Sequence, residues 1–412
     1  MQLPEDFVRY TRYLMGDERF ERFMQAFDEQ PPASIRLNPL KTKGMTVPRG
    51  EPVPWCREGY YLPQRPNFTM DPLLHAGCYY VQEAASMFVT HIIHGLLTPP
   101  PCSRRFSVGS LFPPSPLHAL DLCAAPGGKS TAMIAALPEG SVLYSNEPVR
   151  QRASILLENI TKWGYPNCIV TNSYPRDYRA SKLKFDLILC DVPCSGEGMF
   201  RRDEATIREW SPQNVERCWR LQREIVSDAW ACLNDGGILI YSTCTFNTHE
   251  NEENVRWACE ELGVEVLPVE TQPEWNITGS LLPGFDAPVY RFIPGITRSE
   301  GLFICVLHKK GICRKSEKRS VPTLKVISTQ QSPSSTTHQH PSPLTYSQAI
   351  AYLRGEALTL PPDTPRGIVD VCFMGHPLGT VKNIGTRANN LYPKEWRIRT
   401  TYVPTDYEAV IR

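Results

Sequence analysis

Two cysteines of this sequence stand directly after predicted strands, where a sheet commonly presents reactive side chains. Cys244 follows the apolar run 236–241, and Cys194 follows the run 185–190 together with the carboxylate of Asp191. Ligands of an open α/β sheet bind beyond the carboxyl ends of its strands, so these groups can face one pocket. A single buried cysteine more often packs as a small hydrophobic residue. Two thiols and a carboxylate in one place instead predict covalent chemistry, with one cysteine as nucleophile, the other as acid or base, and Asp191 orienting the substrate.

A glycine-rich turn, Asp-Leu-Cys-Ala-Ala-Pro-Gly-Gly-Lys-Ser at 121–130, lies between a predicted strand and a predicted helix. Its small residues let the backbone approach a ligand closely, and the helix N-terminus offers free amides to a carboxylate or phosphate. The spacing matches neither a P-loop nor a Gly-x-Gly-x-x-Gly motif. Glu147 ends the next strand and is suited to hold the ribose of an adenosine cofactor. It could equally serve as a negative charge at the start of the following helix.

The elements that position these residues alternate between strands and helices. Such alternation implies right-handed crossovers and predicts an α/β fold with a Rossmann-like, doubly wound and mostly parallel sheet. The predicted strands are 117–123, 141–146, 168–171, 185–190, 237–241 and 301–307, and the predicted helices are 129–137, 149–163, 215–233 and 250–262.

The region before this sheet, residues 1–115, has a different pattern. Helical spacing of apolar residues predicts two short helices within 5–28 and a longer helix from Tyr79 to His94. Aromatic residues such as Trp55 and Tyr61 are interleaved with cations, so they could stack on RNA bases or simply pack against their own loop. Six prolines within 99–116 exclude regular structure and mark a boundary.

After the sheet, residues 311–343 are first basic and then rich in Ser, Thr and Pro, which is typical of a linker. Residues 344–412 form a second small unit with a predicted helix at 349–355 and predicted strands at 369–374 and 378–382. Cations, amides and aromatics gather between 382 and 399, a mixture that suits RNA binding.

Composition excludes several classes of protein. The net charge is +1, so any nucleic-acid surface must be local. The fourteen cysteines form no Cys-x-x-Cys pair and have no histidine-rich partner run, which predicts no metal site. No apolar run approaches the roughly twenty residues of a membrane span, and the polar N-terminus lacks a signal core. Scattered cysteines in apolar segments favour a reducing, cytoplasmic location.

Together these motifs resemble those of the Sun-family RNA (cytosine-5)-methyltransferases, and of their bacterial RsmF-like branch in particular. The resemblance rests on Asp-Leu-Cys-Ala-Ala-Pro-Gly-Gly-Lys at 121–129, Asp-Val-Pro-Cys-Ser-Gly-Glu-Gly at 191–198 and Tyr-Ser-Thr-Cys-Thr at 241–245 with Glu-Asn-Glu-Glu-Asn at 250–254. Segments at 34–38, 80–86 and 389–393 also look like that branch.

The resemblance implies S-adenosylmethionine as the methyl donor and a cytosine in RNA, ribosomal more than transfer RNA, as the substrate of a monomeric enzyme. It implies an RNA-recognition region of α+β structure at 1–115, a methyltransferase domain at 116–310, a linker at 311–343 and a mainly-β, PUA-like RNA-binding domain at 344–412. Cys244 is then the nucleophile and Cys194 assists release. The cofactor-binding residues implied are Cys123, Ala124, Ala125, Pro126, Gly127, Gly128, Lys129, Glu147, Ser173 and Asp191.

One position departs from the family pattern. Many relatives carry an Asp after the third strand to meet the adenine, whereas this chain has Asn172, Ser173 and Tyr174 there. Asn172 or Ser173 could replace that contact with a neutral hydrogen bond, or backbone amides could suffice.

The residues support this chemistry in their own right. Carbon 5 of cytosine is a poor nucleophile, so a thiolate must first add at carbon 6. A free thiol has a pKa of roughly 8.5, so a base or positive charge must favour the thiolate. Asp191 could stabilise the adduct at ring nitrogen 3, and Cys194 or water could remove the proton from carbon 5.

Three other interpretations remain to be tested. DNA cytosine-5 methyltransferases place their nucleophile in a Pro-Cys pair, so Pro193-Cys194 could exchange roles with Cys244. The chain could also be an RNA-binding ribosome assembly factor whose methyltransferase core is a non-catalytic scaffold. An amino-group methyltransferase would carry Asn or Asp-Pro-Pro-aromatic after the fourth strand, where this chain has Asp-Val-Pro-Cys.

Overall fold

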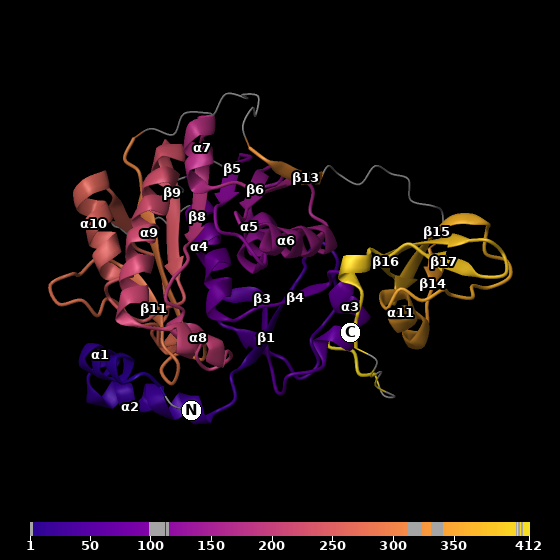
Figure 1. Ribbon diagram of the computed structural model, residues 1–412, viewed down its shortest axis with the longest axis horizontal. Coiled ribbons are helices and arrows are strands. Elements are labelled where there is room, and N and C mark those ends of the chain that lie inside the picture. The colour runs from indigo at the N-terminus through magenta and orange to yellow at the C-terminus, as the bar shows by residue number, and fades with distance from the viewer. Residues whose placement is uncertain are drawn as a thin grey trace.

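A nine-stranded sheet forms the centre of the protein (Figure 1). The structure is a computed structural model that describes residues 3–98, 112, 115–311, 324–330, 341–400, 402, 404 and 407–412. The strand order is β10-β12-β9-β8-β5-β6-β7-β13, and β11 also pairs with β12. The parallel strands are β5 (His118–Asp121), β6 (Val142–Asn146), β7 (Cys168–Thr171), β8 (Phe185–Asp191) and β9 (Leu233–Thr243); the antiparallel ones are β10 (Glu265–Leu267), β11 (Val289–Phe292), β12 (Leu302–His308) and β13 (Val326–Gln330).

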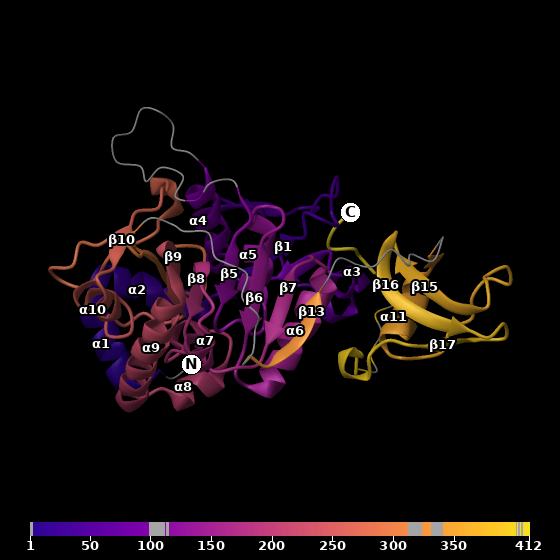
Figure 2. The ribbon, with the colours of Figure 1, turned by 90° about the horizontal axis from the view of Figure 1, so that it is seen from above.

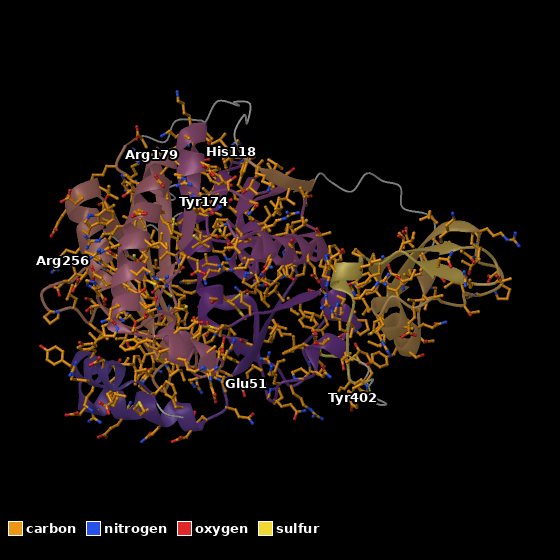
Figure 3. The ribbon with its side chains drawn as sticks, viewed as in Figure 1. Glu51, His118, Tyr174, Arg179, Arg256 and Tyr402 are labelled. Carbon is orange, nitrogen blue, oxygen red and sulfur yellow. The ribbon has the colours of Figure 1, made fainter. Side chains whose placement is uncertain are left out.

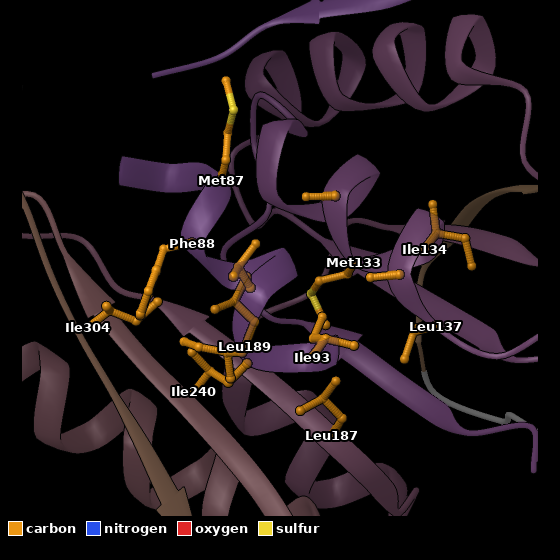
Figure 4. Packing of buried hydrophobic residues seen from close by; sticks show 14 of the residues in the cluster. Met87, Phe88, Ile93, Met133, Ile134, Leu137, Leu187, Leu189, Ile240 and Ile304 are labelled. Carbon is orange, nitrogen blue, oxygen red and sulfur yellow. The ribbon is translucent and has the colours of Figure 1, made fainter. Parts of the chain in front are cut away.

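Helices cover both faces of this sheet, because successive strand residues point to opposite sides and both sets are apolar. The side chains on one face of the sheet pack against residues of α4, α5 and α6. Figure 4 shows this packing for Phe88, Ile93 and Met133. The other set packs with residues of α7, α9 and α10. This arrangement confirms the predicted doubly wound α/β fold. The helices are α4 (Phe88–Leu97), α5 (Gly128–Ala136), α6 (Arg150–Trp163), α7 (Pro175–Ser181), α8 (Glu204–Glu209), α9 (Pro212–Cys232) and α10 (Glu252–Leu262).

The N-terminal region begins with two helices separated at Gly16, as predicted, where φ is +72°. A four-stranded sheet of order β2-β3-β1-β4 follows. The prediction of a helix from Tyr79 to His94 was wrong over its first half. The aromatic and β-branched run at 79–81 instead pairs with β1, which suits such residues better than a helix. The elements are α1 (Glu5–Met15), α2 (Asp17–Gln25), β1 (Ala33–Leu37), β2 (Glu51–Val53), β3 (Cys56–Leu62), α3 (Pro72–His75) and β4 (Tyr79–Val81).

The C-terminal unit is mainly β, as predicted, and lies at one end of the molecule (Figures 1 and 2). It contacts the N-terminal region at α3. Tyr407 donates a hydrogen bond to Asp71 Oδ1 at 2.9 Å, and Tyr346 donates to the carbonyl of Met70 at 3.1 Å. Its elements are β14 (Ser342–Pro343), α11 (Tyr346–Leu353), β15 (Gly367–Phe373), β16 (His376–Asn383) and β17 (Ala388–Asn390).

The stretch predicted as a linker, 311–343, contains one element of the sheet. Strand β13 pairs antiparallel with β7, and the carbonyl of Lys325 accepts a hydrogen bond from the Asn172 amide. The remaining basic and Ser-rich parts of that stretch, and most of the proline-rich segment 99–116, lie outside the described residues. Within the described ranges, none of the helices is long and apolar enough to cross a membrane.

Candidate active site

The order in which the chain adds strands to the sheet reverses between the parallel strands β5 and β8. From β5 the chain proceeds to β6 and β7 on one side, and then returns to β8 and β9 on the other. The carboxyl ends of these two central strands therefore border the crevice in which doubly wound sheets bind ligands. Asp121 ends β5 and Asp191 ends β8. Cys244 follows the last residue of the neighbouring strand β9.

The two cysteine thiols lie side by side at this crevice. Cys194 Sγ and Cys244 Sγ are 3.2 Å apart, and both residues are partly exposed. Backbone bonds tie their loops together, because Gly198 donates to the carbonyl of Cys244 at 2.8 Å and Val192 donates to that of Ser242 at 3.0 Å. The hydrogen bond with Cys244, followed by burial, raises the pKa of Cys194 well above its ordinary value. Cys194 is therefore held as a thiol.

Asp191 and Lys129 form an ion pair next to the thiols. Lys129 Nζ lies 2.9 Å from Asp191 Oδ2, and Ser242 Oγ donates to Asp191 Oδ1 at 2.7 Å. Ser242 can do so because it stands opposite Asp191 in the pairing of β8 with β9. Burial lowers the pKa of Lys129, but attraction to Asp191 and then to Cys244 outweighs burial and raises it overall. Lys129 thus stays positively charged beside the cysteines.

The glycine-rich turn forms one wall of a cavity of about 160 Å³. Gly127 has φ of +113°, a conformation that favours glycine. A Cβ at Gly128 would meet Tyr80 Cε1 at 3.2 Å and Gln82 Nε2 at 3.5 Å, so the absent side chain keeps the wall open. Residues of β4 and of the segment that follows it form the facing wall. The lining residues are Tyr80, Val81, Gln82, Glu83, Ser86, Asp121, Cys123, Ala124, Ala125, Pro126, Gly128, Lys129 and Asp191.

Asp121 is fully buried in this wall. Its Oδ2 accepts a hydrogen bond from Ser130 Oγ at 2.6 Å, whereas its Oδ1 has no hydrogen-bond partner among the described residues. Burial raises the pKa of Asp121 to about 7. A buried acceptor without a partner is costly, so this oxygen suits a donor group on a bound ligand.

Glu147 and Ser173 lie outside the lining of this cavity. Glu147 Oε1 accepts from the Val149 amide at 2.9 Å, so the alternative of a helix-start carboxylate describes part of its role. Asn172 Nδ2 donates to the carbonyl of Glu147 at 2.8 Å, and Ser173 Oγ accepts from the amide of Lys325. The side chains of Asn172 and Ser173 therefore each hold the backbone of a neighbouring segment in place. Tyr174, the next residue, is 55% exposed at the start of α7 (Figure 3).

Sequence reasoning missed two buried carboxylates behind the cysteines. Glu250 accepts hydrogen bonds from the Ser195 amide at 3.0 Å and Gln222 Nε2 at 2.7 Å, and burial raises its pKa to about 7. Glu197 accepts from the Phe246 amide at 2.7 Å. Each carboxylate joins the Cys194 loop to the segment after Cys244. Both residues stand in the motifs at 191–198 and 250–254, but glutamate near a helix start reads as a surface charge.

Aromatic residues proposed to meet RNA in the N-terminal region are buried instead. Trp55 and Tyr61 are each 4% exposed, and Trp55 Nε1 donates to the carbonyl of Ala84 at 2.7 Å. They pack rather than offer stacking faces. In the C-terminal unit, Asn390 Nδ2 donates to the carbonyl of Tyr352 at 2.8 Å, and Tyr392 is 4% exposed. These two residues also stabilise their own unit.

Three family models match successive parts of the chain. The model described as 16S rRNA methyltransferase RsmB/F matches residues 110–308. The N-terminal domain of 16S rRNA methyltransferase RsmF matches residues 3–84, and the methyltransferase RsmF PUA domain matches residues 341–398.

Curated relatives are named as methyltransferases of small-subunit ribosomal RNA. Ribosomal RNA small subunit methyltransferase F of Cronobacter sakazakii is 34% identical over 346 residues, which are 79% of this chain and 66% of that protein. The protein of that name from Escherichia coli O81 is 33% identical over 328 residues, 74% of this chain and 63% of that protein. The chain thus spans just under two thirds of the length of these relatives.

Solved structures share the fold. A methyltransferase homolog protein from Pyrococcus horikoshii is 26% identical with a TM-score of 0.58, and the match covers 74% of this chain and 98% of that one. NSun6 from Pyrococcus horikoshii with SFG is 20% identical with a TM-score of 0.58, and the match covers 75% and 98%.

Proposed function

Because the chain belongs to the family of 16S rRNA methyltransferases RsmB/F, as its motifs predicted, we propose that it methylates carbon 5 of a cytosine in RNA. Ribosomal RNA is the expected substrate, and S-adenosylmethionine is the expected methyl donor. The observation that carries the proposal is the 3.2 Å contact between the Cys194 and Cys244 thiols beside the Lys129–Asp191 ion pair. The attack at carbon 6 and the later release of the product require a nucleophile, a second thiol and a fixed positive charge.

The cavity residues fit S-adenosylmethionine, which would supply an electrophilic methyl group. Asp121 Oδ1, which has no hydrogen-bond partner among the described residues, would be satisfied by the ammonium group of the methionine part. Backbone amides at the start of α5 suit the carboxylate of that part. We expect residues 123–129 and Asp191 to hold this end, and Glu147 and Ser173 to lie toward the adenosine end. Glu147 keeps its Oε2 loosely paired with Arg152, at 3.4 Å, and so able to accept from a ribose hydroxyl.

Cys244 is the proposed nucleophile. The ammonium group of Lys129 would stabilise the negative charge that spreads over the ring after Sγ bonds to carbon 6. Asp191, fixed by Lys129 and Ser242, can accept hydrogen bonds from the amino group and from a proton on nitrogen 3. Oriented hydrogen bonding of this kind would hold carbon 6 at the thiolate.

Cys194 is the proposed base for release. In the free protein its pKa is raised first of all by the hydrogen bond with Cys244. That bond is lost once Cys244 Sγ is bonded to cytosine, so Cys194 loses a proton more easily at the stage when a base is needed. It can then take the proton from carbon 5, directly or through water, and the electron pair left behind expels Cys244 from carbon 6.

RNA containing 5-fluorocytosine tests this assignment. Fluorine at carbon 5 cannot leave as a proton, so wild-type protein with S-adenosylmethionine should form a covalent adduct that survives denaturing electrophoresis. Cys244→Ser should form none. With ordinary RNA, Cys194→Ser should accumulate the adduct that wild type resolves. If Cys244→Ser traps RNA and Cys194→Ser does not, the two cysteines have the opposite roles.

Two further measurements address the substrate and the scaffold alternative. Bisulfite sequencing of total RNA with and without the protein should reveal one protected cytosine, expected in ribosomal RNA. Calorimetry with S-adenosylmethionine should show binding, whereas an assembly factor with a non-catalytic core would bind none. Absence of binding would therefore favour the assembly factor.

A further inference from the structure

The geometry of the two thiols permits a bond that the methyl-transfer reaction does not use. Their sulfur atoms are 3.2 Å apart, and a disulfide needs about 2.05 Å. We expect rotation of the two side chains to close the difference. Backbone hydrogen bonds donated by Gly198 and Val192 already tie the two segments together beside the thiols.

Both thiols can be reached from outside. Each residue is partly exposed, and Cys194 lines a second cavity of about 290 Å³ between its own loop and residues of α8 and α9. Other described cysteines, such as Cys168, Cys190 and Cys305, are buried in the sheet core at 1% exposure or less. Among the described cysteines, Cys194 and Cys244 are the thiols that contact each other.

We propose that Cys194 and Cys244 form a redox-modification site, at which hydrogen peroxide or a similar peroxide joins them in a reversible disulfide. Oxidation removes the nucleophile and the base together, which makes methyl transfer responsive to oxidants. That loss of methyl transfer rests on the proposed function, whereas formation of the disulfide depends on geometry alone.

The chemistry proceeds in two balanced steps. The sulfur of Cys244 attacks one peroxide oxygen, the O–O bond breaks, and a sulfenic acid and one water form. The thiol of Cys194 then attacks the Cys244 sulfur, the S–O bond breaks, and the released hydroxide takes the Cys194 proton to give a second water. Two sulfurs have been oxidised and one peroxide reduced. Cys194 stays protonated, because its hydrogen bond with Cys244 and its burial raise its pKa, so Cys244 is the thiol that reacts first.

The bond also protects the site. A sulfenic acid without a neighbouring thiol is oxidised further to sulfinic acid, which thiol reductants do not reverse. With Cys194 in contact, the disulfide forms instead and a dithiol can restore both thiols. Cytosolic disulfides of this kind are typically transient and regulatory.

Peptide mapping of the full chain tests the proposal. Reduced protein is treated with hydrogen peroxide, its free thiols are alkylated, and the digest is analysed by mass spectrometry. We expect a peptide pair cross-linked through Cys194 and Cys244 that disappears after dithiothreitol. The Cys194→Ser protein should give no cross-link and should instead carry sulfenic acid, trapped by dimedone, at Cys244. Cys218→Ser is the matched control, because Cys218 lines the same second cavity, and its cross-link should match that of wild type.

Recovery of Cys244 as sulfinic acid in wild type, with Cys194 alkylated and no cross-link, would overturn the proposal. Activity is read in parallel, with S-adenosylhomocysteine binding as the check that oxidised protein stays folded. Methyl transfer should fall at least tenfold on oxidation and return after reduction. If the cross-link forms in a protein that never methylates RNA, the proposed function fails and the modification site stands. If reduced protein methylates RNA and peroxide makes no cross-link, the modification site fails alone.

Discussion

Arg36 Nη2 donates a 2.6 Å hydrogen bond to Thr131 Oγ1, which joins β1 of the N-terminal region to the first turns of α5. Arg36 is 2% exposed, and its recorded acceptors are neutral: the Thr131 hydroxyl, Gln82 Oε1 at 2.7 Å and the carbonyl of Gly128 at 3.3 Å. Burial lowers its pKa to about 10. A buried cation is thus used to hold the facing wall of the cavity, at Gln82, against the glycine-rich turn.

Replacing Arg36 by Lys should loosen the cavity. A lysine carries its three donors on a single nitrogen, so it cannot reach the spread-out acceptors that the separate nitrogens of a planar guanidinium meet together. We expect S-adenosylhomocysteine affinity to fall about tenfold and the free energy of unfolding to fall by about 2 kcal/mol, because buried acceptors lose their donors. Calorimetry measures the affinity, and urea unfolding measures the free energy of unfolding. Arg298→Lys, a half-exposed arginine outside the site, should change neither, and unchanged affinity in Arg36→Lys would show that the wall is held without it.

Lys129→Met should slow formation of the covalent adduct. The substitution removes the positive charge beside Cys244 and leaves Asp191 with Ser242 alone. We expect the rate of adduct formation with 5-fluorocytosine RNA to drop about 100-fold, because the negative charge that develops on the ring loses its stabilising partner. Lys129→Arg keeps the charge and should retain much of the rate. Equal rates in wild type and Lys129→Met would mean that other groups stabilise the charge on the ring.

Asp121 should give the protein a pH-dependent stability. Its folded pKa, about 7, lies above the ordinary value of 3.8, so between these values the folded state binds more protons than the unfolded state. Its contribution to stability is therefore present at low pH and is lost as pH rises toward and through 7. Asp121→Asn keeps an oxygen that can accept from Ser130 and cannot ionise. At pH 8 the free energy of unfolding of this variant should therefore exceed that of wild type by on the order of 2 kcal/mol.

At pH 5 the two proteins should differ much less in stability. S-adenosylhomocysteine should bind Asp121→Asn more weakly, because the carboxylate that would meet the ammonium group is gone. Urea unfolding at the two pH values gives the comparison. A stability difference that is the same at pH 5 and pH 8 would show that Asp121 does not titrate in this window.

Much of this site could be read from residue types and spacing. Both cysteines, Asp191 and the glycine turn stand at strand ends, and the alternation of strands and helices brings strand ends to one edge. Local reading failed at Tyr79, where pairing with β1 outweighed a helical pattern, and at β13, which looks polar because it is an edge strand. Those outcomes depend on partners far away in the chain.

The supporting residues were hidden for a related reason. Glu197, Glu250 and Arg36 are charged, and charged residues ordinarily lie at the surface. Each is buried because several donors or acceptors from other segments surround it. A single sequence does not reveal which distant segments surround these residues, although the residues themselves stand inside recognisable motifs. Folding therefore surrounds the reactive groups, which the strand ends already identify, with buried residues from other segments that hold them in place.

Gly128→Ala tests whether the narrow cavity is the cofactor site. The new methyl group would lie 3.2 Å from Tyr80 Cε1 and 3.5 Å from Gln82 Nε2, inside a space of about 160 Å³. Both neighbours are side chains that can give slightly, so the fold should tolerate the change and stability should shift by less than about 1 kcal/mol. Ligand volume is lost, and we expect S-adenosylhomocysteine affinity to fall at least about tenfold. Gly279→Ala is the matched control, since a Cβ there meets nothing within 4 Å. Wild-type affinity in Gly128→Ala would place the cofactor elsewhere, whereas lost affinity that Tyr80→Leu restores in the double variant would locate it between these two walls.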